Sequence, residues 1–337
     1  MPEARQILTL TVLIVILAAA CAWAQTLTYH AFLWSSASGM RDLGSLGTNS
    51  YANSINDAGE VVGYYETSEG NFRAFRWTSS GGMQDLGPVA AEYAAASGIN
   101  SRGEIVGAAS AISGTAVAVT WTPNGITHNL GTLGETSSSA VAINEQGAVA
   151  GSASTAGNAR TVAFLWTPKT GMHSLGTLGS SYSYGYAINS AGTVVGASPL
   201  NDTLTPNHAF MKAPGSKITD LGTLGGDDST ALGVSASGNI VGWASLSAFI
   251  PFHAFLWTQA SGILDLGTLG GQNSAAQAIN QAGQIAGHSD LTQSGVTHAA
   301  LWTAPNEIQD LGTLGGTYST ATAINNSGVV VGWSSLP

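Results

Sequence analysis

The sequence predicts an all-β fold, a seven-bladed β-propeller with four antiparallel strands in each blade. Three observations lead to this prediction. A unit of 43 to 46 residues recurs seven times between His30 and the C-terminus. Each unit holds four short apolar segments, which is the strand content of one propeller blade. The repeat region begins with the last two segments of a unit and ends with the first two, so the two ends together complete a seventh blade.

The four segments of each unit follow one order, and we name them by their place in the predicted blade. Segment A ends in Ala-Ile-Asn, and segment B reads Gly-x-Val-Val-Gly. Segment C is the motif His-Ala-Phe-Leu-Trp-Thr, and segment D runs into Asp-Leu-Gly. Each is short, rich in β-branched or aromatic side chains and bounded by Gly or Asn, as β-strands are. The anchor residues of successive C segments are Trp34, Trp77, Trp121, Trp166, Lys212, Trp257 and Trp302.

Segments B and C are apolar at consecutive positions, for example at Phe32, Leu33 and Trp34. Both faces of such strands must be buried, which favours sheets stacked between neighbouring sheets. Segment A is built from small residues such as Ala94 and Ala95, which suits the crowded strand beside a propeller axis. The turn between A and B reads Asn-x-x-Gly in most copies, a pattern typical of a type I turn.

The recurrent Trp, His and Asp residues are expected to be structural. The Trp anchors belong in the core, packed over the bare backbone of the glycines in segment B. Four histidines begin segment C, but equivalent third strands of successive blades lie too far apart for two of them to share a metal ion. They are His30, His208, His253 and His298. We expect them to form structural hydrogen bonds, and the Asp of segment D, such as Asp42, to cap a turn.

Composition limits the classes of partner. Only 8% of the residues are charged and the net charge is −10, whereas a globular chain is typically about 25% charged. Eight Lys and Arg residues follow Ala24, and they are scattered, so no nucleic-acid partner is expected. The net charge opposes self-association, and we expect a monomer.

Residues 1–24 read as a secretory signal peptide, and residues 25–337 as a single propeller domain. Arg5 precedes an apolar run over residues 7–20, and Ala-Trp-Ala at 22–24 fits a cleavage site before Gln25. The run is shorter than the roughly 20 residues of a membrane span, so no span is expected after cleavage. An uncleaved anchor and a lipid attachment at Cys21 remain open alternatives. Since Cys21 is the only cysteine, the mature chain would hold no disulfide, and its expected location is extracellular or periplasmic.

The repeat resembles the HAF repeat family, a family of extracellular repeats named for the tripeptide of segment C. His30-Ala31-Phe32, His208-Ala209-Phe210 and His253-Ala254-Phe255 match that tripeptide directly, and the resemblance covers residues 30–333. The copies at Met211-Lys212 and His298-Ala299-Ala300 depart from it. The resemblance implies secretion and a bacterial setting, and it brings no established activity or functional residues with it.

Candidate binding residues lie in the connections between segments. The B–C connections vary most in length, and in a four-stranded blade they emerge on the same face as the D–A connections, so we expect any ligand on this face. Non-repeat carboxylates and tyrosines cluster in the D–A connections, and one B–C connection has an apolar tip. The candidates are Glu92, Tyr93, Glu135, Tyr182, Asp227, Asp228, Phe249 and Tyr318. The alternative is that these are ordinary solvated loop residues.

The sequence contains no nucleophile elbow, phosphate loop, metal triad or dinucleotide fingerprint, so no catalytic residue, metal or cofactor is expected. The leading hypothesis is a non-enzymatic binding module for a protein or glycan ligand. The alternative is a carbohydrate-active enzyme in the axial funnel. It would need two carboxyl groups about 5 to 9.5 Å apart, for which Glu92 and Glu135 are the best pair.

Overall fold

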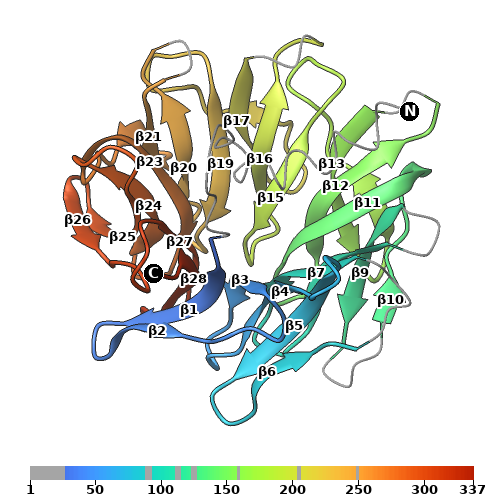
Figure 1. The fold of residues 1–337 in the computed structure, drawn as a ribbon. Coiled ribbons are helices and arrows are strands. Elements are labelled where there is room, and N and C mark those ends of the chain that lie inside the picture. The colour runs from blue at the N-terminus through green and yellow to red at the C-terminus, as the bar shows by residue number, and fades with distance from the viewer. Residues whose placement is uncertain are drawn as a thin grey trace.

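The computed structural model describes residues 27–87, 93–110, 115–122, 127–157, 160–202, 206–247 and 250–337. They form seven four-stranded antiparallel sheets arranged in a ring, which confirms the predicted seven-bladed propeller (Figure 1). The predicted signal peptide, residues 1–24, lies outside the described residues. Within those residues no helix is long and apolar enough to cross a membrane.

Each blade runs from an inner strand outward in chain order. The first and second blades are β3 (Asn49–Ile55), β4 (Val61–Glu66), β5 (Phe72–Thr78), β6 (Gly82–Asp85) and β7 (Ala94–Ile99), β8 (Ile105–Ser110), β9 (Ala116–Trp121), β10 (Thr127–Asn129). The third and fourth are β11 (Gly134–Ile143), β12 (Val149–Thr155), β13 (Arg160–Thr167), β14 (Gly171–Ser174) and β15 (Tyr184–Ile188), β16 (Val194–Pro199), β17 (Asn207–Lys212), β18 (Thr219–Asp220). The fifth and sixth are β19 (Ser229–Val234), β20 (Ile240–Ser245), β21 (Phe252–Thr258), β22 (Gly262–Asp265) and β23 (Gly270–Ile279), β24 (Ile285–Leu291), β25 (Thr297–Ala304), β26 (Glu307–Asp310).

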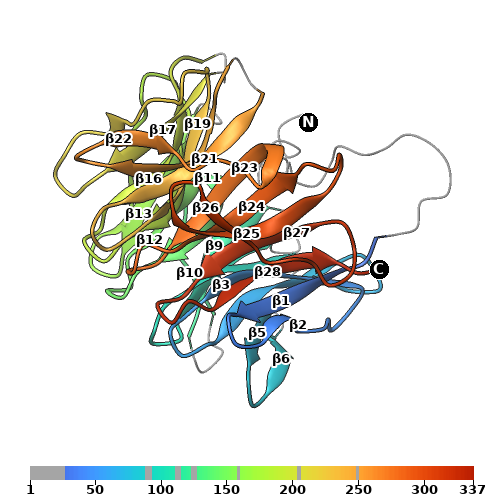
Figure 2. The ribbon, with the colours of Figure 1, turned by 90° about the vertical axis from the view of Figure 1, so that its left-hand side faces the viewer.

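The closing blade takes two strands from each end of the chain. It consists of β27 (Ser319–Ile324), β28 (Val330–Ser335), β1 (Tyr29–Ser35) and β2 (Gly39–Asp42). β28 pairs antiparallel with β1 from Tyr29 opposite Ser335 to Trp34 opposite Val330. Both views show β1, in blue, beside β28, in red (Figures 1 and 2). The predicted two-plus-two closure is confirmed, and the inner strands of neighbouring blades contact one another around the whole ring.

Every inner strand carries a one-residue bulge, and this bulge explains the glycine of segment B. In the first blade the register shifts between Ala52 and Ser54. A Cβ built on Gly63 would lie 1.9 Å from the carbonyl oxygen of Tyr51, closer than any side chain allows. Only glycine fits where the bulged inner strand pushes its carbonyl against the second strand.

The aromatic residue over this glycine is Phe, so the prediction that Trp lies there is wrong. Gly63 pairs with Phe75, whereas Trp77 pairs with Val61 two residues further along the same face. In the third blade the Phe164 ring is close enough that a Cβ on Gly151 would lie 2.9 Å from it. The Trp anchors instead pack near the A–B turn end of each sheet, where Trp77 is 5% exposed.

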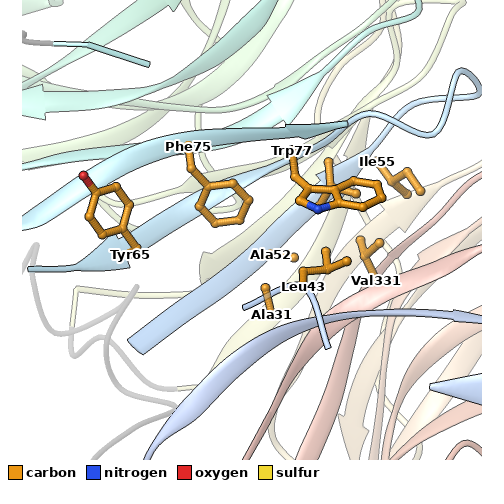
Figure 3. Packing of buried hydrophobic residues seen from close by; sticks show 9 residues of the cluster. Ala31, Leu43, Ala52, Ile55, Tyr65, Phe75, Trp77 and Val331 are labelled. Carbon is orange, nitrogen blue, oxygen red and sulfur yellow. The ribbon is translucent and has the colours of Figure 1, made fainter. Parts of the chain in front are cut away.

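The core lies between the blades and is filled by both faces of each sheet. Figure 3 shows the cluster between the closing blade and the first blade, where Leu43 and Val331 face Trp77 and Phe75. Similar clusters lie between the other blades. The consecutive apolar positions of segments B and C therefore serve stacked sheets, as predicted.

A buried serine fastens each blade to its neighbour in six of the seven junctions. Ser229 Oγ accepts the backbone N–H of Ala209 at 2.8 Å and donates to the carbonyl of Gly222 at 2.6 Å. Ala209 is the middle residue of a His-Ala-Phe motif in the preceding blade. The equivalent serines are Ser50, Ser138, Ser183, Ser274 and Ser319, and Ala94 stands at the remaining junction.

The histidines of segment C pair with the aspartates of segment D within one blade, which confirms the structural role predicted for both. His253 Nδ1 lies 2.8 Å from a carboxylate oxygen of Asp265, and Asp265 also accepts the N–H of Gly267 at 2.7 Å. The same pairs are His30–Asp42, His208–Asp220 and His298–Asp310. In the first blade Arg73 replaces the histidine and lies 2.8 Å from Asp85.

The asparagines of the A–B turns form a ring around the axis. Asn144 Oδ1 accepts the N–H groups of Gln146 and Ala148 at 3.0 and 2.9 Å, which shapes its own turn. Its Nδ2 donates to the carbonyl of Asn189 in the next blade at 3.0 Å. The inter-blade bonds of this kind run from Asn56, Asn100, Asn144, Asn189, Asn280 and Asn325. The turn role was predictable from one repeat, whereas the inter-blade role was not.

The ring has one break, at Ser235 in the fifth blade, where the side chain is too short to reach Asn280. We expect Ser235→Asn to stabilise the protein by about 1 kcal/mol, because it adds one inter-blade hydrogen bond at a buried site. The free energy of unfolding from urea titrations measures the effect. A variant with lower stability than wild type would contradict the ring as a stabilising device.

Candidate functional site

Seven aromatic side chains form a continuous row at the B–C and D–A end of the propeller. In the closing blade, Tyr318 stacks on Trp333 with ring centroids 5.0 Å apart. Trp333 meets Tyr51 of the first blade edge to face at 5.4 Å, and Tyr51 stacks on Tyr64 at 4.8 Å. We call the row the aromatic arc; it comprises Tyr318, Trp333, Tyr29, Tyr51, Tyr64, Phe72 and Tyr93. It spans three blades, from the closing blade to the start of the second.

The sequence positions of the arc follow from the blade geometry. Tyr318 and Tyr93 directly precede inner strands β27 and β7, so they lie in D–A connections. Tyr51 and Tyr64 are cross-strand partners on β3 and β4, which brings their rings together. Trp333 on β28 is the counterpart of Tyr64, since each follows the glycine of segment B.

The arc is half-buried, so its rings are held by packing while part of each remains accessible to solvent. Burial raises the pKa of Tyr51, Tyr64 and Tyr318 far above the usual value, and the nearby Glu66 carboxylate raises the pKa of Tyr51 and Tyr64 further. The phenol groups therefore stay neutral across the physiological range. Neutral phenols can both donate and accept hydrogen bonds to a ligand.

A pocket of about 330 Å³ adjoins the arc and supplies polar groups. It is lined by Leu27, Thr28, Thr48, Asn49 and Glu66. Asn49 Nδ2 donates to Glu66 at 2.7 Å, and Asn49 Oδ1 accepts the N–H of Tyr29 at 2.8 Å. A carboxylate and an amide thus lie in fixed positions beside flat apolar rings. Such a combination suits a ligand with an apolar face and hydroxyl groups at its edges.

Two of the predicted site residues, Tyr93 and Tyr318, belong to this arc. Tyr182 precedes β15 in the fourth blade and lies outside it. Glu135 is exposed in the third blade, where its carboxylate accepts the N–H of Gly157 at 3.2 Å. Glu92 and Phe249 lie outside the described residues.

The two adjacent aspartates differ in environment. Asp227 is exposed, but Asp228 is only 6% exposed and accepts the N–H of Asn207 at 2.8 Å, so it anchors the start of β17 rather than facing solvent. Asn49 and Asn273 do the same for Tyr29 and Phe252. Asp228 therefore occupies the place that Tyr93 and Tyr318 hold in other blades, directly before the first residue of the inner strand.

Trp333, Tyr29 and Tyr51 were not among the predicted site residues, because they lie in strands β28, β1 and β3 rather than in the connections from which the candidates were drawn. One signal was available. The residue after the glycine of segment B is Ala or Ser in three blades, and a larger side chain, such as Tyr64 or Trp333, in the others.

His288 takes that same position in the sixth blade. It is packed between the sixth and closing blades, and its Nδ1 lies 3.1 Å from Thr320 Oγ1. Burial lowers the pKa of His288 to about 4, against a smaller opposing effect of Asp290. The fold therefore favours the neutral imidazole.

The pKa of His288 predicts a loss of stability in acid. The unfolded chain binds the proton near pH 6.5, so the stabilisation is complete above that pH and is lost as the pH falls toward 4. We expect His288→Asn to reduce the difference in unfolding free energy between pH 7 and pH 4.5 by about 2 kcal/mol. Urea titrations at the two pH values measure this difference. An equal difference in wild type and variant would contradict a neutral His288.

Among the described residues, no three His, Cys, Asp or Glu side chains converge in a way that could hold a metal ion.

Solved structures of other proteins share the fold. A putative TolB from Agrobacterium tumefaciens is 10% identical with a TM-score of 0.54, over 93% of this chain and 99% of that chain. The β-propeller domain of the Trilobed protease from Pyrococcus furiosus is 9% identical with a TM-score of 0.52, over 82% of this chain and 88% of that chain. TolB from Acinetobacter baumannii is 8% identical with a TM-score of 0.44; the match covers 90% of this chain but only 63% of that protein.

For the two structures with TM-scores above 0.5, the likeness at these identities shows the fold alone. No protein-family model matches this chain, and no curated protein matches it. The Trilobed protease domain is described as having an open velcro topology, whereas here β1 and β28 close the ring.

Proposed function

We propose that this chain is a secreted, non-enzymatic binding module that holds a glycan on the aromatic arc. The observation that supports it most is the unbroken row of rings across three blades, with Glu66 and Asn49 in the adjoining pocket. A pyranose ring has an apolar face of C–H bonds that packs on aromatic rings, and hydroxyl groups at its edge that bond to carboxylates and amides. The arc offers both kinds of contact side by side.

The charge of the protein favours a neutral glycan. The net charge is −10, and Glu66 lies in the pocket itself. On the arc, the Glu66 carboxylate would repel an acidic group brought against the rings, and the net charge adds to this repulsion for a polyanion, so the electrostatics at the arc favour a neutral glycan.

Secretion rests on the sequence of residues 1–24 and on a mature chain without cysteine, and the resemblance to the HAF repeat family agrees with it. These features support an extracellular or periplasmic monomer. Membership in that family is part of the same proposal.

A glycan array combined with a reducing-end assay on soluble polysaccharides tests the proposal. The expected result is retention of the purified protein on neutral glycans without release of new reducing ends. Turnover that disappears in Glu135→Gln would instead support the alternative of a carbohydrate-active enzyme. Absence of retention on every neutral glycan would contradict the proposed function.

A further inference from the structure

A second concave surface lies at the other end of the axis, away from the aromatic arc. All seven blades contribute to its lining, six of them through their A–B turns and the second through Ile99, and its volume is about 280 Å³. Its floor is a ring of β-branched side chains that end the inner strands: Ile55, Ile99, Ile143, Ile188, Val234, Ile279 and Ile324. Its rim is formed by the residues that follow the ring asparagines: Asp57, Ser101, Glu145, Ser190, Ala236, Gln281 and Asn326. We call this surface the axial basin; its rim residues are all exposed.

Rim N–H groups point toward the neighbouring turn, as three of them show. The N–H of Ser101 donates to the Glu145 carboxylate at 3.1 Å, and the Ser101 hydroxyl donates to the same group. The N–H of Asn326 donates to Asp57 Oδ1 at 2.9 Å, and that of Gln281 to Asn326 Oδ1 at 3.1 Å. In each case a carboxylate or amide oxygen from the next blade caps the rim N–H.

Elsewhere on the rim the next blade provides no cap. The N–H of Glu145 would need a cap from the Ser190 side chain, and the N–H of Ser190 would need one from Ala236. Both side chains are too short to reach the preceding turn. Gln281 follows Ala236 and makes no such bond among the described residues. Among the described residues, the N–H groups of Asp57, Glu145, Ser190 and Ala236 therefore have no protein acceptor, and the last three are consecutive around the ring. The repeat places them in the same orientation as the capped ones.

We propose that this sector of the axial basin, formed by the turns of Glu145, Ser190 and Ala236, binds a carboxylate ligand. Backbone N–H groups that line a concavity and have no internal acceptor are donors for an anion. Elsewhere on the rim, the equivalent N–H groups of Ser101 and Asn326 donate to the carboxylates of Glu145 and Asp57. A carboxylate is therefore an acceptor that suits the N–H groups of the uncapped sector.

The ligand is a carboxylate presented from outside. The groups that cap the other rim N–H groups are side-chain carboxylates and an amide, those of Glu145, Asp57 and Asn326. Because the rim is open to solvent, the uncapped sector can receive a carboxylate from outside: the end of an acidic side chain, a chain terminus or a small dicarboxylate. The carboxylates of Glu145 and Asp57 are already engaged with Ser101 and Asn326. Both point away from the free sector, toward the preceding blade.

Backbone amide shifts in a nitrogen–proton correlation spectrum test the proposal directly. Glutarate and a short peptide ending in Glu are titrated separately. We expect the amides of Glu145, Ser190 and Ala236 to shift, and those of Ser101, Gln281 and Asn326, which are already capped, to stay. Tighter binding of the peptide would assign the ligand to a protein, and equal or tighter binding of glutarate would assign it to a small carboxylate. No shift in the free sector with either probe, or equal shifts at the capped amides, would overturn the proposal.

Two variants separate capping from charge. Ala236→Glu introduces a carboxylate that can cap the Ser190 N–H in the way that Glu145 caps the Ser101 N–H. Ala236→Gln introduces an uncharged acceptor at the same position. We expect both to weaken glutarate binding by tenfold or more, because each offers the Ser190 N–H an internal partner. Unchanged affinity in both variants would contradict the proposal, as would a loss confined to Ala236→Glu, which charge repulsion alone explains. Unchanged amide shifts in the other blades verify that both variants fold.

Discussion

Deletion of residues 319–337 is expected to abolish cooperative folding. It removes β27 and β28, which leaves β1 without its inner partner along the full register from Tyr29 to Trp34. It also exposes the clusters on both sides of the closing blade and removes Asn325 from the ring of asparagines. The expected loss exceeds the total stability of a typical domain, about 5–15 kcal/mol. Calorimetry of the truncated chain should show no transition like that of the intact protein.

Deletion of residues 336–337 alone is the matched control. It removes one described backbone hydrogen bond, from Leu336 to Thr28, and leaves both strands in place. Its melting temperature is expected to stay within a few degrees of the intact value. A chain lacking residues 319–337 that melts like this control would refute the role of the closing blade.

Gly242→Ala is expected to destabilise the protein by about 4 kcal/mol or more. A Cβ at this position would lie 1.9 Å from the carbonyl oxygen of Thr230, which belongs to the bulged inner strand of the same blade. Neither backbone can withdraw without breaking the pairs on either side, so the strain is large. The free energy of unfolding measures it.

Gly238→Ala in the A–B turn of the same blade separates this clash from the conformational freedom of glycine. Gly238 has φ of +86°, but a Cβ there would meet nothing within 4 Å. The expected cost is about 1 kcal/mol, that of an alanine in the left-handed region. Equal costs for the two variants would show that the close approach in the second strand is unimportant.

The repeat made the fold predictable at the level of strands. Spacing between Trp anchors set the number of blades, and the half-units at the two ends implied the closure that β1 and β28 form. Asn144 and its counterparts were correctly read as turn residues, because the pattern is local.

Contacts across strands were harder to predict, because they depend on register. The pairing of β4 with β5 runs without a bulge and places Gly63 opposite Phe75, and the residue types of the two segments do not fix this register. For this reason the prediction placed Trp77, rather than Phe75, over Gly63.

One coupling within the repeats was readable but easily overlooked. Asp is replaced by Asn129 and Ser174 in the two copies where valine, Val117 or Val162, stands in place of the histidine. A role as a turn cap explains why Asn or Ser can replace the aspartate. It does not explain why the histidine is lost in the same two copies, and this joint loss indicates the His–Asp contact that the structure contains.

The candidate site was predictable only in part. Tyr93 and Tyr318 are recognisable because they break the repeat in D–A connections. Their link runs through Trp333 and Tyr51, which meet only because the ring closes and places the last blade beside the first. A contact between residues so far apart in the chain cannot be read from a single unit of about 45 residues.

The most direct test of the proposed function compares two tryptophans in equivalent positions. Trp333 lies within the aromatic arc, whereas Trp243 follows the segment B glycine of the fifth blade and contacts Phe252 outside the arc. Calorimetric titration with the neutral glycan retained best on the array measures affinity for wild type, Trp333→Ala and Trp243→Ala. We predict at least about a tenfold loss in Trp333→Ala, equivalent to 1.4 kcal/mol, and wild-type affinity in Trp243→Ala. Equal affinities in the two variants would contradict glycan binding by the aromatic arc.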